Sequence, residues 1–239
     1  MLGAWFHRYP REMTTSVVDL LQYERPLVLR GEIVVGIDEV GRGALAGPMT
    51  VGAVVLVDDA APPRGLNDSK LLTPAKREAL VDPLRAWAAD WSLGSVSADE
   101  IDAWGLRLAL AVAATRALDG LRVAPSHALI DGSFNLLTAP LDIGFGIETP
   151  PELRYWHLPV TTIVRGDCSS AAIAAAAVLA KVSRDRRMSE MHDEFPQYGW
   201  SANKGYGAPG HLQAIRTHGP SAQHRRSWKL PQKAPPPLT

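Results

Sequence analysis

The sequence predicts an α/β protein in which helices pack against a mixed β-sheet. Two kinds of segment support this class: short apolar runs rich in β-branched residues, and longer segments that carry helix-capping signals. Two strand-like runs come first and strand-like and helix-like segments then alternate, an order typical of layered α/β folds. The 239 residues are 46% hydrophobic, which excludes wholesale disorder and allows one large domain with a small appendage.

The first elements surround a glycine-rich loop. Residues 15–30 predict a short helix that ends near Pro26, because proline interrupts helices. The run IVVGI at 33–37 is typical of a strand buried on both faces. MTVGAVVLV at 49–57 predicts a second strand, which we expect to pair antiparallel with the first.

The middle of the chain carries two helix starts. Thr73 followed by Pro74 is an N-cap with proline at the first helical position, and it predicts a helix. WSLGSVS at 91–97 predicts a third strand. A capping box that begins at Ser97 then predicts a long amphipathic helix ending near Gly120.

Two further strands and a buried helix follow. HALID at 127–131 and LPVTTIV at 158–164 read as short strands, and an alanine-rich helix is expected at 170–192. After it we expect a glycine-rich loop, a short helix and a proline-rich tail.

Composition and charge narrow the classes of function. The single cysteine, Cys168, excludes a disulfide framework and a cysteine-rich zinc site, and it fits a reducing cytoplasm. The sequence shows no signal peptide and no apolar run long enough to span a membrane. The chain is neutral overall, but from Phe195 onward it carries six Lys or Arg and no Asp or Glu. An acidic site beside a basic surface would suit an enzyme that acts on a polyanion, although an uneven solvated surface fits equally well.

Acidic residues end three of the predicted strands. Asp38 and Glu39 follow the first apolar run, Asp131 ends the HALID segment, and Asp167 follows the LPVTTIV segment. Ligands gather at the carboxyl ends of parallel strands in open α/β sheets. Carboxylates that meet there need a cation, and an all-oxygen set suits Mg²⁺ or Mn²⁺ rather than zinc. Taken singly, Asp131 also fits a turn and Asp167 a helix start, so the predicted metal site depends on the whole set.

The loop GRGALAGP resembles a dinucleotide-binding fingerprint only superficially. Its spacing is G-x-G-x-x-x-G, and a strand rather than a helix follows it. Gly41 and Gly43 flank Arg42, so the loop offers backbone groups beside a positive charge, which suits contacts with sugar and phosphate.

Long blocks of the sequence resemble ribonuclease HII, the type 2 ribonuclease H family. In chain order they are GIDEVGRGALAGPMTVGAVVL, LNDSKLLTPAKRE, ALIDG, IVRGDCSSAAIAAAAVLAKVSRDRRM, NKGYG and GPSAQHRRSW. Together they extend over nearly the whole chain. Several long blocks in a fixed order are far more specific than any single motif.

The resemblance implies a fold and a division of the chain. The fold is RNase H-like, with a mixed five-stranded sheet flanked by helices and a small helical C-terminal extension. The implied parts are an N-terminal helical segment at 1–30, a catalytic domain at 31–193, a substrate-binding extension at 194–230 and a flexible tail at 231–239.

The resemblance also implies an activity. It is endonucleolytic hydrolysis of the phosphodiester 5′ to a ribonucleotide, in RNA–DNA hybrids and in duplex DNA with embedded ribonucleotides, with a role in removing ribonucleotides from DNA. Two Mn²⁺ or Mg²⁺ ions would catalyse the cut and leave 5′-phosphate and 3′-hydroxyl ends. The four residues that match the family's catalytic metal ligands are Asp38, Glu39, Asp131 and Asp167.

Substrate-binding residues carry over by position as well. Gly41, Arg42 and Gly43 match the element that senses the ribose 2′-hydroxyl, and Tyr206 matches a tyrosine that packs on the next deoxyribose. The implied phosphate contacts are Lys70, Lys181 and Arg184. Judged without the resemblance, Tyr206 fits a loop anchor, and Lys181 and Arg184 fit a solvated helix face.

Some residues lie outside this pattern. His224, Arg225 and Arg226 are interpreted as a surface cluster. Three positions depart from the family, with Ala44 in place of a frequent proline, Arg165 in place of a lysine and Ala177 in place of a serine. None of the three is a predicted metal ligand.

Two other functions stay open at this point. One is a different RNase H-fold DNA nuclease of the resolvase type, and the other is a non-catalytic hybrid-binding protein. We expect RNA–DNA hybrids and ribonucleotide-containing duplexes as partners, a monomer, no membrane association and a cytoplasmic location. Both Mg²⁺ and Mn²⁺ are compatible with the sequence, and so are single ribonucleotides and long hybrids as the preferred substrate. A clamp or polymerase partner is neither indicated nor excluded.

Overall fold

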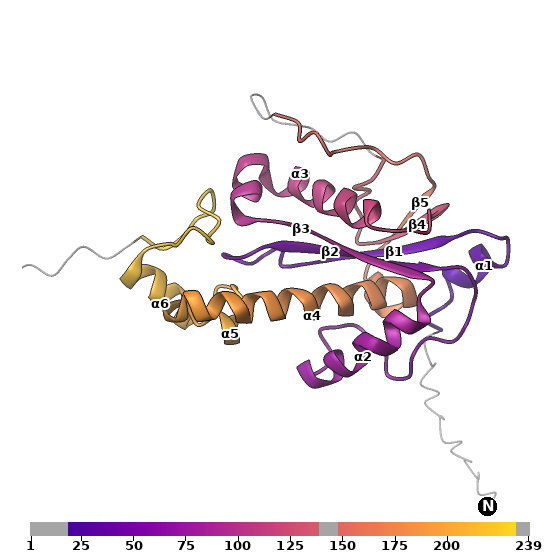
Figure 1. Cartoon of the computed structure of the whole chain (residues 1–239), viewed down its shortest axis with the longest axis horizontal. Helices are drawn as coiled ribbons and strands as arrows, with labels where there is room; N and C mark the ends of the chain where they lie inside the picture. The colour runs from indigo at the N-terminus through magenta and orange to yellow at the C-terminus, as the bar shows by residue number, and fades with distance from the viewer. Residues whose placement is uncertain (1–18, 139–147, 233–239) are drawn as a thin grey trace, which may run out of the picture.

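A five-stranded sheet forms the centre of the computed structural model, which describes residues 19–138 and 148–232 (Figure 1). The strand order is β3-β2-β1-β4-β5. Strands β1 to β3 pair antiparallel, whereas β4 pairs parallel with β1 and with β5. The predicted mixed five-stranded sheet is therefore confirmed. The strands are β1 (Val34–Val40), β2 (Met49–Leu56), β3 (Asp90–Val96), β4 (His127–Asp131) and β5 (Val160–Ile163).

Helices cover both faces of this sheet (Figure 1). Helix α3 lies on one face, and α4 with α2 lies on the other. The α-helices are α1 (Glu24–Val28), α2 (Pro74–Trp87), α3 (Ala98–Asp119), α4 (Ala171–Glu194), α5 (Trp200–Asn203) and α6 (Pro209–His218). Short 3-10 helices at Gly166–Cys168 and Pro196–Tyr198 flank α4.

Both predicted helix starts are present. The Thr73 side chain accepts a hydrogen bond from the Lys76 N–H and caps α2, and Ser97 and Glu100 form the capping box of α3. Helix α3 also contains a break that its sequence pattern did not predict. Gly105 has a φ of +73°, so the helix is kinked after its first two turns.

Two boundaries differ from the prediction. Pro26 does not end a helix but lies in the first turn of α1, where its missing N–H would have no intrahelical partner. Strand β1 does not stop at residue 37, because its pairing with β2 continues through Val40. Asp38 and Glu39 therefore belong to the strand and not to the loop after it. Residues 1–18 and 233–239, which include the first four residues of the helix predicted at 15–30 and most of the predicted tail, lie outside the described part.

The alanine-rich helix α4 lies unusually close to the sheet. A Cβ atom on Gly36 would come within 2.2 Å of the Ala172 backbone, and one on Gly52 within 2.4 Å of the Ala176 carbonyl oxygen. Glycine on the strands and alanine on the helix thus remove the side chains that would hold the two apart. Since α4 follows the direction of β1, this contact carries its later residues past the end of that strand.

The C-terminal extension packs on the far end of α4. Trp200, Tyr198 and Ile215 form a small apolar core with Met188 and Met191 of α4. A β-bridge between Ala46 and His224 attaches the last described segment to the loop after β1. In the described part of the chain, no helix is long and apolar enough to cross a membrane.

Candidate active site

A cavity of about 250 Å³ lies where β1 ends. It is lined by nine of the eleven predicted site residues, and the other two, Asp167 and Arg184, are not part of its lining. The nine are Asp38, Glu39, Gly41, Arg42, Gly43, Lys70, Asp131, Lys181 and Tyr206. The structure thus brings together residues from β1, β4, α4 and the loops before α2 and α6.

Strand alternation separates the two adjacent acids of β1. Val34 belongs to the same apolar cluster as Ile173 of α4, whereas Val35 and Ile37 belong to the core beneath α3. The period of two therefore directs Asp38 toward the α4 face and Glu39 toward the α3 face. Ile37 of β1 pairs with Ile130 of β4, so the next residues, Asp38 and Asp131, lie beside each other and their side chains point to the same face of the sheet.

The Asp38 carboxyl is buried among other acids. Only 7% of the residue is exposed, and one oxygen accepts the Glu39 N–H at 2.7 Å. Burial, followed by the charges of Asp131 and Glu39, raises the pKa of Asp38 well above its usual value. Burial also raises the pKa of Glu39, an effect that the nearby Arg42 partly offsets. Such a set of acids is stabilised in its charged form by a cation.

Asp131 and Asp167 are held differently. The Gly166 N–H donates to Asp131 at 2.7 Å, yet burial raises the pKa of that carboxyl. Asp167 is also buried, which favours its neutral form, but the Lys70 ammonium 2.8 Å from its Oδ2, together with hydrogen bonds to Asp68 and Cys168, lowers its pKa. Lys70 therefore supplies the positive charge on this side of the site.

An additional acid, Asp68, lies beside Asp167. Within the described residues, the compact group of possible metal ligands consists of Asp68, Asp167 and Cys168, whose ligand atoms all lie within 4.8 Å of one another. The predicted quartet is less compact, because Asp167 turns toward Lys70 and Asp68 while the other three acids line the cavity. Sequence reasoning missed Asp68, although it stands two residues before Lys70 in the Asn-Asp-Ser-Lys block.

The Gly-Arg-Gly loop is fixed from behind by Arg225. This fully buried guanidinium donates to the carbonyl oxygens of Gly41 at 2.6 Å, Arg42 at 2.7 Å and Gly47 at 3.3 Å. Burial lowers the pKa of Arg225 to about 10. Arg225 and His224 are both buried, so the interpretation of residues 224–226 as a surface cluster is wrong for these two.

Arg184 has a structural position and not the predicted phosphate contact. Only 1% of it is exposed, and its guanidinium donates to Pro48 O at 2.7 Å, Lys204 O at 2.9 Å and Ala46 O at 3.2 Å. Gly41, with a φ of +85°, makes room for it, since a Cβ there would lie 2.1 Å from the Arg184 Nε. This burial leaves the guanidinium inaccessible to a phosphate. Sequence spacing could not reveal it, because the three carbonyls come from distant loops.

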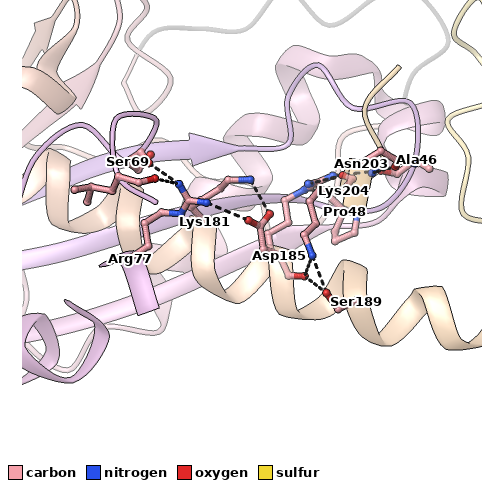
Figure 2. Close-up of polar contacts among 12 residues, drawn as sticks. Ala46, Pro48, Ser69, Arg77, Lys181, Asp185, Ser189, Asn203 and Lys204 are labelled. Atoms are coloured by element: carbon pink, nitrogen blue, oxygen red, sulfur yellow. Dashed lines mark hydrogen bonds and ion pairs between the residues drawn. The ribbon is translucent and has the colours of Figure 1, made fainter. Parts of the chain in front are cut away.

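The next residue of α4, Asp185, joins three cationic side chains (Figure 2). Lys181 donates to its carboxylate at 2.7 Å, and Arg77 lies 3.9 Å from its other oxygen. Arg77 also donates to the Ser69 carbonyl at 2.8 Å, which fixes the loop that carries Lys70. The Lys204 ammonium donates to the Asp185 carbonyl oxygen at 3.2 Å. One turn of α4 thus connects the loops on either side of the cavity.

A buried histidine pair supports the loop that carries Tyr206. The His211 Nδ1 donates to the Tyr206 carbonyl at 2.8 Å, so its Nε2 accepts from the Trp200 indole at 3.1 Å. His224 accepts the Ser221 N–H through its Nδ1, so its Nε2 donates to His211 at 3.1 Å. Both imidazoles are therefore neutral. Burial lowers the pKa of each, and that of His224 falls to about 4.

Comparison with known proteins supports one family throughout. Residues 35–231 match the family model described as Ribonuclease HII. Ribonuclease HII of Geobacillus thermodenitrificans is 44% identical over 211 residues, which cover 88% of this chain and 74% of that protein. Ribonuclease HII of Burkholderia mallei is 45% identical over 198 residues, which cover 83% of this chain and 84% of that protein.

Solved structures show the same fold. The ribonuclease H2 of Pyrococcus horikoshii superposes with a TM-score of 0.64 at 27% identity, over 82% of this chain and 94% of that one. The RNase HII of Archaeoglobus fulgidus, solved in complex with PCNA, has a TM-score of 0.61 at 26% identity, over 84% of this chain and 98% of that one. Together with the family match, these similarities show that the chain belongs to the ribonuclease HII family and is a hydrolase that acts on RNA–DNA hybrids.

Proposed function

We propose that this chain cuts the phosphodiester 5′ to a ribonucleotide, both in RNA–DNA hybrids and at single ribonucleotides in duplex DNA. The products would carry 5′-phosphate and 3′-hydroxyl ends, and the biological role would be removal of ribonucleotides from DNA. The observation that supports this proposal is the composition of the 250 Å³ cavity, in which acids, the Gly-Arg-Gly loop and an aromatic residue line the same space.

The acids suit divalent cations. Asp38, Glu39, Asp131 and Asp167 offer only carboxylate oxygens, the donors that Mg²⁺ and Mn²⁺ prefer. Burial and mutual repulsion already raise the pKa of Asp38, so positive charge at this position would stabilise its ionised form. Two such ions, when bound, stabilise the charge on the attacking and leaving oxygens of a phosphodiester displacement.

The chain's own residues would orient the substrate. Arg225 fixes the carbonyls of Gly41 and Arg42, so the loop would offer a rigid backbone to the ribose 2′-hydroxyl, the group that distinguishes RNA from DNA. Tyr206 is partly exposed, and its ring lies 5.4 Å from the buried Arg184 guanidinium. That contact would hold the ring as a platform for the neighbouring deoxyribose. Lys70 and Lys181 line the same cavity and would contact phosphates.

A cleavage assay tests the proposal. A labelled DNA duplex with one ribonucleotide and an all-DNA duplex are incubated with the protein in Mn²⁺, Mg²⁺ or EDTA. We expect one metal-dependent cut 5′ to the ribonucleotide and an intact all-DNA duplex. Asp38→Asn should abolish the cut, whereas Asp82→Asn, a change at a highly exposed acid on α2, should not.

The other outcomes would overturn the proposal in different ways. Cleavage of the all-DNA duplex would favour a resolvase-like nuclease. Binding of both duplexes without any cut would favour a hybrid-binding protein. Loss of folding in Asp38→Asn would show that Asp38 is a structural residue.

A further inference from the structure

A second cavity adjoins the first. Its volume is about 350 Å³, and it shares Glu39, Arg42 and Asp131 with the first cavity. The rest of its wall comes from α3 and from the segment after β4. These residues are Leu106, Arg107, Leu110, Gly132, Ser133, Phe134 and Leu136.

The two cavities lie on opposite faces of the sheet edge. The first includes Ala177 and Lys181 of α4, and the second includes Leu106 and Arg107 of α3. Helices α4 and α3 cover opposite faces of the sheet (Figure 1). The acids at the strand ends therefore lie between two hollows. A nucleic-acid strand cut at those acids extends in both directions from the cut, whereas Lys70, Lys181 and Tyr206 line only the first hollow.

Arg107 is the distinctive residue of the second cavity. Its guanidinium lies over the Phe134 ring, 4.6 Å from the ring centroid, and the residue is exposed. Across the described residues it takes part in no ion pair, unlike Arg42, which lies 3.4 Å from Glu39. The sequence agrees, since the helical positions three and four residues after it are Leu110 and Ala111, and the kink at Gly105 interrupts the helix before it. Stacking on an aromatic ring orients the guanidinium without neutralising it.

The surroundings of Arg107 match a sugar–phosphate backbone. A planar guanidinium binds phosphate oxygens with two parallel hydrogen bonds. The Ser133 hydroxyl provides a further donor at the rim, and the leucine side chains offer an apolar floor for a sugar. The kink at Gly105 comes just before Leu106 and Arg107, so the helix changes direction where it contributes to the cavity.

We propose that the α3-side cavity binds the cleaved strand on the flank opposite Lys181, with Arg107 as a phosphate contact. This inference rests on the proposed function, because it takes a ribonucleotide-containing duplex as the substrate. Arg107 touches the substrate backbone away from the reacting atoms, so it contributes to binding and leaves the chemical step unchanged.

Substitution of Arg107 tests the contact. With the single-ribonucleotide duplex, Arg107→Ala should raise KM about tenfold and leave kcat within about twofold, as expected for the loss of one charge-assisted contact. The slope of log affinity against log salt should become shallower by about 0.9, the value for one phosphate contact on duplex DNA. Arg107→Lys should keep most of the salt slope. Arg85→Ala is the matched control. The Arg85 guanidinium, on α2, also stacks on an aromatic ring, 4.5 Å from the centroid of Trp91, but Arg85 does not line either cavity.

A scan of neutral linkages locates the contact. Single methylphosphonates are placed along the cleaved strand on both flanks of the ribonucleotide. At one position on one flank, the neutral linkage should weaken binding by the unsubstituted protein. The same linkage should not weaken binding by Arg107→Ala any further, because that variant has already lost the contact. An unchanged salt slope in Arg107→Ala, or equal losses for both proteins at every position, would overturn the inference. Failure of the unsubstituted protein to cut the ribonucleotide duplex would instead overturn the proposed function.

Discussion

Lowering the pH from 7 to 5 should destabilise the folded chain through His224. In the fold this imidazole is fully buried, accepts the Ser221 N–H and donates to His211. Burial, followed by the proximity of His211, lowers its pKa from 6.5 to about 4. A proton on the ring would remove the acceptor for Ser221 and place a charge in an apolar cluster.

The sign and size follow from proton linkage. Because the unfolded chain binds this proton more readily than the folded chain, the stabilisation is fully present above pH 6.5 and is lost as the pH falls toward 4. Over the whole window this one group accounts for about 3 kcal/mol, and between pH 7 and pH 5 for about 2 kcal/mol.

Urea unfolding at pH 7 and pH 5 measures the effect. His224→Asn keeps an acceptor for Ser221 but cannot be protonated, so its loss of stability between the two pH values should be about 2 kcal/mol smaller than that of the unsubstituted chain. His157→Asn, at an exposed histidine, should lose as much as the unsubstituted chain. An equal loss in His224→Asn would refute the reasoning. If that variant did not fold, NMR titration of His224 in the unsubstituted chain would still decide, because a ring that is protonated at pH 5 contradicts the same argument.

Three further predictions concern the carboxylates. Asp38→Asn should lower the cleavage rate by more than about 100-fold. In EDTA at pH 7 the same change should raise the melting temperature, because it removes a buried carboxyl whose ionisation the fold opposes. Lys70→Met should raise the pKa of Asp167 in the metal-free chain, as NMR carboxyl titration would show, since the ammonium 2.8 Å away is the strongest of the groups that lower it. Asp185→Asn should cost about 1–3 kcal/mol in urea unfolding because it weakens a partly buried acceptor of the Lys181 and Arg77 cations. Glu190→Gln, at an exposed acid of the same helix, should change stability little, and an equal cost in both would contradict the assigned role of Asp185.

Local signals account for the elements that were predicted correctly. The caps at Thr73 and Ser97 satisfy N–H groups within three residues, so a short stretch of sequence determines them. The path of β1 is different, since the strand continues through Asp38 and Glu39 only because β2 lies beside it. The sequence predicted this partner strand, but its local pattern did not show how far the pairing extends.

The sequence predicted most residues that line the cavity but not how their surroundings are organised. A family resemblance placed nine residues that line one cavity, because short blocks of sequence identify them directly. It could not separate Arg184 from Lys181, which lie three residues apart on the same helix. Lys181 reaches the cavity, whereas Arg184 donates to carbonyl oxygens of the β1–β2 loop, more than 100 residues earlier in the chain, and of Lys204. When backbone groups that are distant in the sequence bury a cation, the sequence around that cation shows no periodic pattern that would indicate it.

The bond between Arg225 and Gly41 joins residues 184 positions apart. During synthesis, at 5–20 residues per second, roughly 10–40 s pass between the making of these two residues. The acids and the glycine loop therefore exist long before the arginine that fixes the loop. A nascent chain thus carries Asp38 and Glu39 in an unfinished setting, and the loop becomes rigid only after Arg225 has been made.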